Sequence, residues 1–272
     1  MCATCGCGGD GAVITLAGHD SHHHPHPHDH DHPHDHIQTQ TITLEQKVLA
    51  KNDLVAEENR RWLAERNILA LNMTSSPGAG KTTLLERTIR DLGGQHPIAV
   101  IEGDQETLLD ANRIRAAGAS AVQINTGAGC HLDADMVRRA LDALDPEPGS
   151  LLFIENVGNL VCPALFDLGE TSKVVVISVT EGADKPLKYP HMFAAAGLVI
   201  INKTDLLPYV DFDLEACAGH ARSLNAGVNI LPLSATTGDR ISDWYRWIAI
   251  LANRPPNAHR SQTFVDKTNV PE

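Results

Sequence analysis

The sequence predicts an α/β fold with three layers, in which helices cover both faces of a mainly parallel β-sheet. Two observations predict it. Short apolar runs alternate with longer helical stretches along most of the 272 residues. The runs are continuously apolar, with little polar alternation, and this pattern is typical of parallel strands that are buried on both faces. In such sheets, ligands bind at the carboxyl ends of the strands, so the loops there are the first place to look for chemistry.

The predicted elements follow one another in a regular order. Residues Leu44–Arg66 carry spaced apolar side chains and no Gly or Pro, which predicts one or two amphipathic helices packed on the domain that follows. The predicted strands are Leu69–Met73, Ile98–Ile101, Ala121–Ile124, Leu151–Ile154, Val174–Val179, Leu198–Ile201 and Ile230–Leu233. The predicted helices between and after them are Thr82–Leu92, Thr107–Ala117, Ala134–Leu144, Leu187–Ala196, Leu214–Leu224 and Asp243–Ala252.

The composition divides the chain into four parts: a cysteine motif at 1–18, a histidine-rich segment at 19–40, a domain at 41–254 and a loose polar tail at 255–272. Ten of the fifteen histidines lie in the second part, interleaved with Asp and Pro. Such a segment has no apolar face to offset the entropy of ordering, so we expect a disordered, flexible tether. The interleaving argues against an expression tag, which is usually an uninterrupted histidine run.

Composition also excludes several classes of function. The net charge of −12 opposes nucleic-acid binding, which needs a clustered basic face. No stretch reaches the roughly 18 apolar residues of a membrane span, and the beginning of the sequence lacks the pattern of a secretory signal. Six cysteines could pair in principle. A protein of this size with the P-loop described below, however, belongs in a reducing compartment, where Cys-x-x-Cys spacing indicates metal or redox chemistry before disulfides. We therefore expect a cytoplasmic protein that contacts neither nucleic acid nor membrane.

A glycine-rich loop, Ser75–Thr83, follows the first predicted strand and opens the first helix of the sheet domain. Successive backbone N–H groups in such a loop surround a β-phosphate. Lys81 would neutralise phosphate oxygens, and the Thr82 hydroxyl would bind Mg²⁺. Ser75 stands where the usual pattern has its first glycine. The loop predicts a P-loop NTPase whose phosphate contacts come from Gly78, Ala79, Gly80, Lys81, Thr82, Thr83 and, from a later loop, Gly158.

A second motif, Asn202-Lys203-Thr204-Asp205, directly follows the strand Leu198–Ile201. The Asp205 carboxylate can accept hydrogen bonds from guanine N1–H and the exocyclic amine, a donor pair that adenine lacks. Lys203 can lie along the base plane. Residues Ser234 and Ala235 follow the last strand, and we expect their backbone N–H groups to complete the base pocket. The sequence therefore favours GTP over ATP.

The hydrolytic residues are expected at two further strand ends. Asp104 closes the second strand, and Glu155 opens the segment Glu155–Gly158, where a switch that senses the γ-phosphate belongs. We expect Mg²⁺ to be bound through Thr82, Asp104 and Glu155, and we assign catalytic roles to Lys81, Asp104 and Glu155. The sequence reveals no arginine finger, so slow turnover that a partner or dimerisation accelerates is the natural expectation.

The sequence also contains two groups of cysteine and histidine side chains that could bind a transition metal. Cys2, Cys5 and Cys7 lie together near the first residue. Thiolates with an amine favour square-planar Ni²⁺, and thiolates in a tetrahedron suit Zn²⁺. The alternative is a reactive, flexible end that binds nothing.

The second group is Cys130, His131 and Cys162, which follow two different predicted strands. Both segments lie at carboxyl ends, so these residues can converge near the γ-phosphate. Metal occupancy and nucleotide state would then bias one another. The alternative is that both cysteines are core residues and that His131 belongs to a surface loop.

With these residues in hand, the chain resembles the HypB family, the hydrogenase nickel-incorporation GTPases. The resemblance covers Thr41 to Asn253 and the N-terminal cysteines. The residues that carry it are Cys2, Cys5, Gly6, Cys7, Ser75–Thr82, Ile101–Gln105, Asn125–Leu132, Glu155–Pro163, Asn202, Lys203 and Asp205.

The resemblance implies a fold of the class that includes signal-recognition and MinD-type NTPases, and GTP hydrolysis to GDP coupled to nickel delivery into the [NiFe]-hydrogenase large subunit. It also implies a tight N-terminal nickel site and a weaker nickel/zinc site matching Cys130, His131 and Cys162. A homodimer promoted by nucleotide or metal, a HypA-type nickel accessory protein and the hydrogenase large-subunit precursor are the implied partners.

Three other functions compete with this interpretation. A urease-type nickel-insertion GTPase shares the chemistry, but its members typically carry Glu-Ser-Gly-Gly-Asp-Asn where this chain has Glu155-Asn156-Val157-Gly158-Asn159. A cobalamin-related metallochaperone would show a Cys-x-Cys-Cys run that is missing from the sequence. The third alternative belongs to a different class of function: the protein would be mainly a nickel store, with GTP acting only as a conformational regulator.

Overall fold

The computed structural model describes residues 36–104, 109–127 and 129–253. A single sheet of seven parallel strands forms its centre, in the order β3-β2-β4-β1-β5-β6-β7. The strands are β1 Leu69–Ser75, β2 Ile98–Asp104, β3 Ser120–Asn125, β4 Leu151–Glu155, β5 Ser172–Ser178, β6 Ala196–Asn202 and β7 Asn229–Pro232. Each predicted strand is present, and most are one to three residues longer than the apolar run that predicted them.

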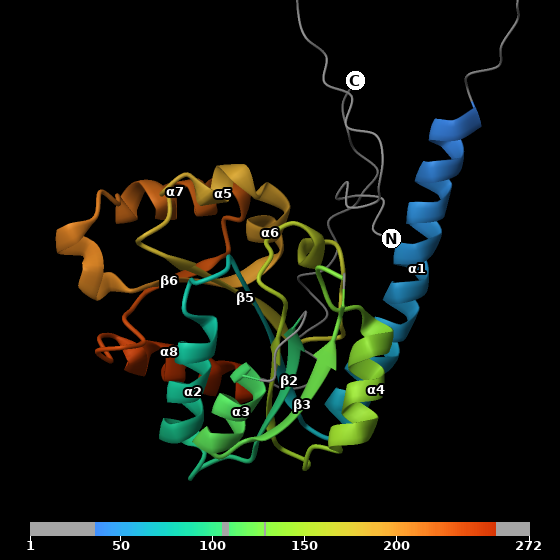
Figure 1. Cartoon of the computed structure of the whole chain (residues 1–272), viewed down its shortest axis with the longest axis horizontal. Coiled ribbons are helices and arrows are strands. Elements are labelled where there is room, and N and C mark those ends of the chain that lie inside the picture. Colours follow the sequence, from blue (N-terminus) through green and yellow to red (C-terminus); the bar gives the residue numbers. More distant parts are fainter. Residues whose placement is uncertain (1–35, 105–108, 128, 254–272) are drawn as a thin grey trace, which may run out of the picture.

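Helices cover both faces of this sheet (Figure 1). The α-helices are α1 His36–Glu65, α2 Lys81–Leu92, α3 Leu109–Ala117, α4 Ala134–Leu144, α5 Lys185–Lys188, α6 Pro190–Ala195, α7 Leu214–Leu224 and α8 Ile241–Ala252. Two short 3₁₀ helices, Cys162–Ala164 and Thr204–Tyr209, follow β4 and β6. None of the helices in the described parts of the chain is long and apolar enough to cross a membrane.

The three layers arise from the alternation of side chains along each strand. Leu71 on β1 packs into a core with Ile89 of α2 and Trp244 of α8. Its neighbour Ala70 points to the opposite face and packs with α1 and α4, where Leu63 is one of the buried side chains. A third apolar cluster lies under α6 and α7, against β5 and β6. The predicted three-layer α/β class is therefore confirmed.

Parallel pairing brings the carboxyl ends of the strands to one edge. The register pairs Glu102 of β2 with Glu155 of β4, and Met73 of β1 with that same Glu155. The loops after β1, β2 and β4 therefore emerge side by side. This arrangement places the P-loop, the Asp104 segment and the predicted switch at one end of the molecule.

One predicted helix was wrong. The segment Leu187–Ala196 contains two short helices, because Pro190 lacks the N–H that would continue the first one, and Ala196 already belongs to β6. The boundaries of the four predicted parts stay predictions, and 1–35 and 254–272 lie outside the described residues.

Candidate nucleotide and metal sites

The P-loop has the backbone that its glycines predict. Gly78 has φ 75° and Gly80 has φ 93°, a left-handed conformation that other residues rarely adopt. A Cβ at Gly80 would also collide with the side-chain amide of Asn202. Lys81 is the first residue of α2, so the helix N-terminus faces the loop. Backbone N–H groups at such a terminus form an anion-binding site.

Glu155 lies at the centre of the candidate hydrolytic site. Its Oε1 accepts a hydrogen bond from Thr82 Oγ1 at 2.7 Å and lies 3.0 Å from Lys81 Nζ. The side chain is almost fully buried, and its Oε2 has no hydrogen-bond partner among the described residues. A buried carboxylate oxygen without a partner is costly, so this oxygen is suited to binding a cation.

Further carboxylates gather around the same point. Glu102 is buried and its Oε2 also lacks a partner among the described residues. Burial, together with the nearby charges of Glu155, Asp110 and Asp104, raises the pKa of Glu102 to about 8. Asp110 of α3 also accepts a weak hydrogen bond from Thr82 Oγ1 at 3.4 Å. This concentration of negative charge, which Lys81 only partly offsets, fits a Mg²⁺ site built from oxygen ligands.

These residues line a cavity of about 400 Å³ at the carboxyl edge of the sheet. The P-loop forms one wall, and the ends of β2 and β4 form another. The lining residues are 75–83, Glu102, Gly103, Asp104, Asp110, Arg113, Glu155, Asn156, Gly158 and Lys203. The structure thus brings together the phosphate-binding and hydrolytic residues that the sequence predicted. It adds Asp110 and Arg113, which we did not predict because they lie in the middle of a helical pattern.

The Asn202–Asp205 motif is attached directly to the P-loop. Asn202 is buried, and its Nδ2 donates to Ala79 O at 2.9 Å. Lys203 has a left-handed backbone, with φ 64°, and its Nζ donates to Gly78 O at 2.7 Å. The motif and the phosphate loop are therefore held together by hydrogen bonds. A site that binds both the base and the phosphates of a nucleotide requires such a fixed arrangement.

Asp205 is exposed, and its Oδ1 accepts a hydrogen bond from Ser234 Oγ at 2.5 Å. The backbone N–H groups of Ser234 and Ala235 donate to Asp239 O and to Asn202 Oδ1, each at 3.0 Å. These two residues therefore contact Asp205 and Asn202, and their predicted contact with a base stays a prediction.

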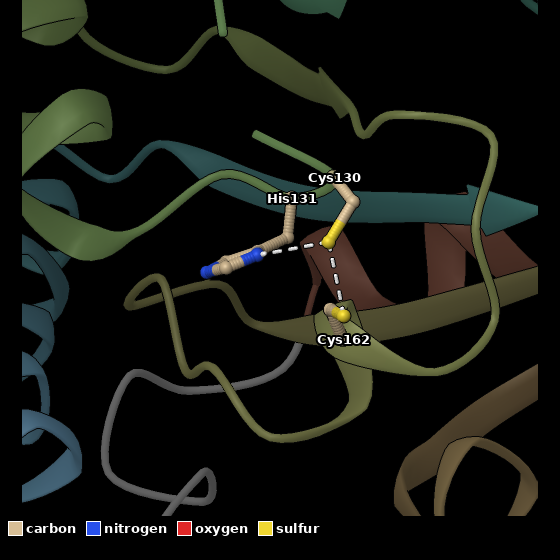
Figure 2. A group of neighbouring side chains, drawn as sticks. All are labelled: Cys130, His131 and Cys162. Carbon is tan, nitrogen blue, oxygen red and sulfur yellow. Dashed lines mark hydrogen bonds between the residues drawn. The ribbon is translucent and has the colours of Figure 1, made fainter. Parts of the chain in front are cut away.

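Cys130, His131 and Cys162 lie together (Figure 2). Their ligand atoms are all within 4.8 Å of one another. The two sulfurs are 3.0 Å apart, and Cys130 Sγ lies 3.7 Å from His131 Nδ1. Cys162 is buried, and the other two residues are half-buried. Two thiols and one imidazole that converge in this way form a donor set suited to Ni²⁺ or Zn²⁺.

The surroundings of His131 favour its metal-binding form. Its ring packs on the ring of Phe166, with centroids 4.0 Å apart. Burial lowers the pKa of His131, although the nearby Asp133 raises it. The neutral imidazole, which is the form that binds metals, is therefore favoured. Phe166 was not predicted, because nothing in its local sequence marks a stacking partner.

The segment after Glu155 joins the two sites. Asn156 is buried, and its Oδ1 accepts a hydrogen bond from Leu132 N, beside His131, at 3.2 Å. Asn159 Nδ2 donates to Cys130 O at 3.2 Å. The predicted switch therefore contacts both the Lys81–Thr82 pair, through Glu155, and the loop that carries two of the metal-ligand candidates. Cys2, Cys5 and Cys7 lie outside the described residues.

Fold and site together define a P-loop nucleotide-binding protein with a thiol and imidazole cluster beside its switch. The family model described as CobW/HypB/UreG, nucleotide-binding domain, matches residues 69–232 of the chain. Hydrogenase maturation factor HypB of Azotobacter vinelandii is 59% identical over 76% of this chain and 68% of its own length. The protein of that name from Escherichia coli is 56% identical over 76% of this chain and 71% of its own length.

Two solved structures agree with these relatives. HypB from Helicobacter pylori in complex with nickel has a TM-score of 0.72 and 37% identity, covering 79% of this chain and all of that one. Hydrogenase maturation factor HypB from Archaeoglobus fulgidus has a TM-score of 0.70 and 40% identity, covering 75% of this chain and all of that one. The chain belongs to the HypB family of hydrogenase maturation factors.

Proposed function

We propose that this chain is a GTP-hydrolysing nickel metallochaperone that stores nickel and delivers it to the large subunit of a [NiFe]-hydrogenase. One observation carries the proposal: the segment Glu155–Asn159 touches the P-loop at one end and the Cys130–Leu132 loop at the other. A change at the phosphate site would therefore reach the metal site. The HypB relatives support the process, and the nickel complex of the H. pylori protein supports the metal.

In the proposed reaction, each residue has a defined role. The N–H groups of the P-loop and Lys81 hold the phosphates, and Asn202 and Asp205 hold guanine. Thr82, Asp104 and Glu155 would bind Mg²⁺, with Glu102 close by. When bound, that ion neutralises charge that develops on the transferred phosphate. Glu155 would exchange its contact with Lys81 for one to the bound ion, and Asn156 would transmit that movement to Leu132.

Nickel is the cargo in this proposal. Cys130, His131 and Cys162 would bind it, or Zn²⁺, in the domain, and Cys2, Cys5 and Cys7 would bind it at the N-terminus. The histidines of 19–36 would supply many weak sites on one tether, where effective concentration makes them useful as a store. A HypA-type accessory protein, the large-subunit precursor and a second copy of the chain are the proposed partners, in the cytoplasm.

A mainly storing role is the second candidate, because ten histidines lie in a segment of eighteen residues. The test uses cells that lack this protein and are supplied with Lys81→Ala. The delivery proposal predicts low hydrogenase activity with both scarce and ample nickel. Full activity of Lys81→Ala under ample nickel would reject coupled delivery and favour storage. Exposed Lys188 provides a matched control, and Lys188→Ala should restore normal activity in both conditions.

A further inference from the structure

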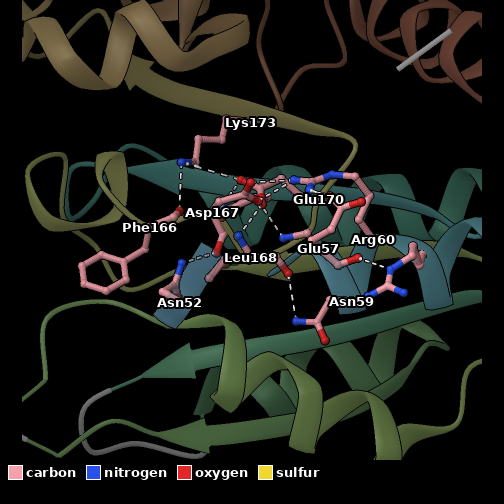
Figure 3. Close-up of polar contacts among 12 residues, drawn as sticks. Asn52, Glu57, Asn59, Arg60, Phe166, Asp167, Leu168, Glu170 and Lys173 are labelled. Carbon is pink, nitrogen blue, oxygen red and sulfur yellow. Dashed lines mark hydrogen bonds and ion pairs between the residues drawn. The ribbon is translucent and has the colours of Figure 1, made fainter. Parts of the chain in front are cut away.

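Helix α1 forms polar contacts, through Asn52 and Asn59, with the segments that follow the candidate metal ligands; Figure 3 shows those with Asp167 and Leu168. The amide of Asn52 accepts a hydrogen bond from Ala134 N at 2.9 Å and donates one to Asp167 O at 2.8 Å. The amide of Asn59, two turns further along α1, donates to Ala134 O at 2.9 Å and to Leu168 O at 3.1 Å. Each asparagine therefore bridges the same two segments of the chain.

These two segments are extensions of the ligand loops. Ala134 begins α4, three residues after His131. Asp167 follows Cys162 by five residues, and between them lies Phe166, whose ring packs on His131. The ligands come from loops after different strands, so their spacing depends on how these loops are held together. The asparagines of α1 hold these two segments together.

Other contacts fix α1 against the segment that contains Asp167 and Gly169. Arg60 forms an ion pair with Asp167, in which its Nη2 donates to Oδ1 at 2.8 Å and to Oδ2 at 2.6 Å. Gly169 has φ 89°, and a Cβ there would lie 2.6 Å from Ala56 O and 2.7 Å from Asn59 Cβ. The backbone of the ligand loop thus packs directly on the backbone of α1, which leaves little freedom for Asn59 to move alone.

The bridges contribute less to overall stability than their number suggests. Asn59 is fully buried, and its Oδ1 has no hydrogen-bond partner among the described residues. The cost of burying that oxygen offsets part of the gain from the two bonds that the amide donates. We therefore expect the loss of an asparagine to change the geometry between the loops more than it changes the folding of the domain.

We propose that Asn52 and Asn59 are positioning residues for the metal site, and that the docking of α1 sets the affinity of Cys130, His131 and Cys162 for a divalent metal. This inference rests on the proposed function, since it requires the cluster to bind metal. Residues that hold ligands in place typically change metal affinity ten- to a hundredfold when they are removed. The cysteine and histidine segments directly precede α1 in the chain. A partner that binds them and thereby moves α1 would also change the geometry of this metal site.

The test uses the full chain with Cys2, Cys5 and Cys7 replaced by Ser and the ten histidines of 19–36 replaced by Gln, so that neither the N-terminal thiols nor the histidine segment binds metal. Asn52→Ala and Asn59→Ala are each titrated with Ni²⁺ against a chelator and examined with Co²⁺, whose absorption reports thiolate ligation and geometry. We expect each variant to bind Ni²⁺ at least about tenfold more weakly and to shift the Co²⁺ bands. Guanine nucleotide affinity without metal should stay the same.

A matched control is Asn225→Ala. Asn225 also bridges two backbone carbonyls, of Ala194 and Ala196, and neither belongs to a ligand loop. It should leave the affinity and the spectrum unchanged. Asn52→Asp, which has the same size and keeps only the acceptor for Ala134 N, covers the case in which the Ala variants do not fold, and it should also weaken metal binding.

Two results would overturn the proposal in distinguishable ways. Asparagine variants with the parent's Ni²⁺ affinity and Co²⁺ spectrum would show that the bridges serve folding alone, whatever their melting temperature. If the parent chain without these N-terminal cysteines and histidines binds neither ion, the metal site itself is rejected, and the positioning role fails with it.

Discussion

Lys81 and Glu155 form a buried ion pair inside the candidate nucleotide site, with Nζ 3.0 Å from Oε1. Lys81 is the residue expected to bind phosphate, and Glu155 begins the segment that reaches the metal ligands. A bound phosphate would compete for Lys81, and a bound cation would compete for Glu155. Under the proposed function, nucleotide binding would therefore act on Glu155, the residue directly before Asn156, whose Oδ1 accepts from Leu132 N in the ligand loop.

Replacement of this lysine should separate the two activities. Lys81→Ala removes the charge that neutralises the phosphates, so GTP turnover should fall by about a hundredfold or more. Nickel should still bind to Cys2, Cys5 and Cys7, because that site is far along the chain and needs no nucleotide. Turnover by phosphate release and nickel content by metal analysis are measured on one sample. Loss of tight nickel binding in this variant would contradict independent sites.

The stability of the cation-free protein should depend on Glu102. Burial raises its pKa to about 8 in the folded state, from an ordinary value of 4.5. The folded state therefore holds a proton that the unfolded state has lost between these values, and stability falls as the pH rises from about 4.5 to 8. The slope from one such group is at most about 1.4 kcal/mol per pH unit.

Glu102→Gln should flatten that dependence, because an amide does not titrate. Chemical denaturation at pH 5 and pH 8, with chelator present, measures it. The exposed Glu147→Gln is the control and should keep the parent slope. An identical slope in Glu102→Gln would show that this carboxyl is not the group that loses its proton on unfolding.

The sequence predicted a helix well where a local signal, such as a capping residue, also marks the end of that helix. The predicted bounds of α4 and α7 agree with the structure, since Asp133 and Asp213 cap them by accepting from Met136 N and Ala216 N. The helix predicted over Leu187–Ala196 failed because a long apolar pattern outweighed a proline within it.

The site was predictable where a motif names its residues, and not where distant segments meet. The P-loop and the Cys130, His131 and Cys162 cluster came from motifs. No motif marked Asp110 or Phe166, because their roles depend on the register of the strands and the path of the loop before β5. The asparagines of α1 were likewise hidden, since an amide in a helix gives no sign of which backbone groups it will reach.

Asp205 should decide the choice of base. Asp205→Asn exchanges an acceptor for a donor, so GTP should bind on the order of a hundredfold more weakly, while xanthine nucleotide, with a carbonyl in place of the amine, should gain. Competition binding with both nucleotides measures this. Asp211→Asn, at an exposed position in a following loop, is the control. Unchanged discrimination against xanthine nucleotide would remove Asp205 from the base-reading role.

Cys162 should be a ligand and not only a core residue. Cys162→Ala removes one of two sulfurs that lie 3.0 Å apart, so the domain should bind nickel at least about tenfold more weakly, and turnover should no longer respond to nickel. Cys217→Ala is the matched control, because Cys217 is equally buried but lies in α7, in the core under that helix. Equal metal stoichiometry in both variants would return Cys162 to a purely structural role.

The central claim is that nucleotide state controls the metal site through Glu155 and Asn156. The most direct measurement is the Ni²⁺ affinity of the reduced protein with GDP and with a non-hydrolysable GTP analogue, with the N-terminal cysteines replaced by Ser and the ten histidines of 19–36 replaced by Gln. We predict that the two nucleotides give affinities for the Cys130, His131 and Cys162 site that differ by about fivefold or more. Equal affinities in both states would contradict the account and leave GTP hydrolysis acting on a partner instead of on the metal.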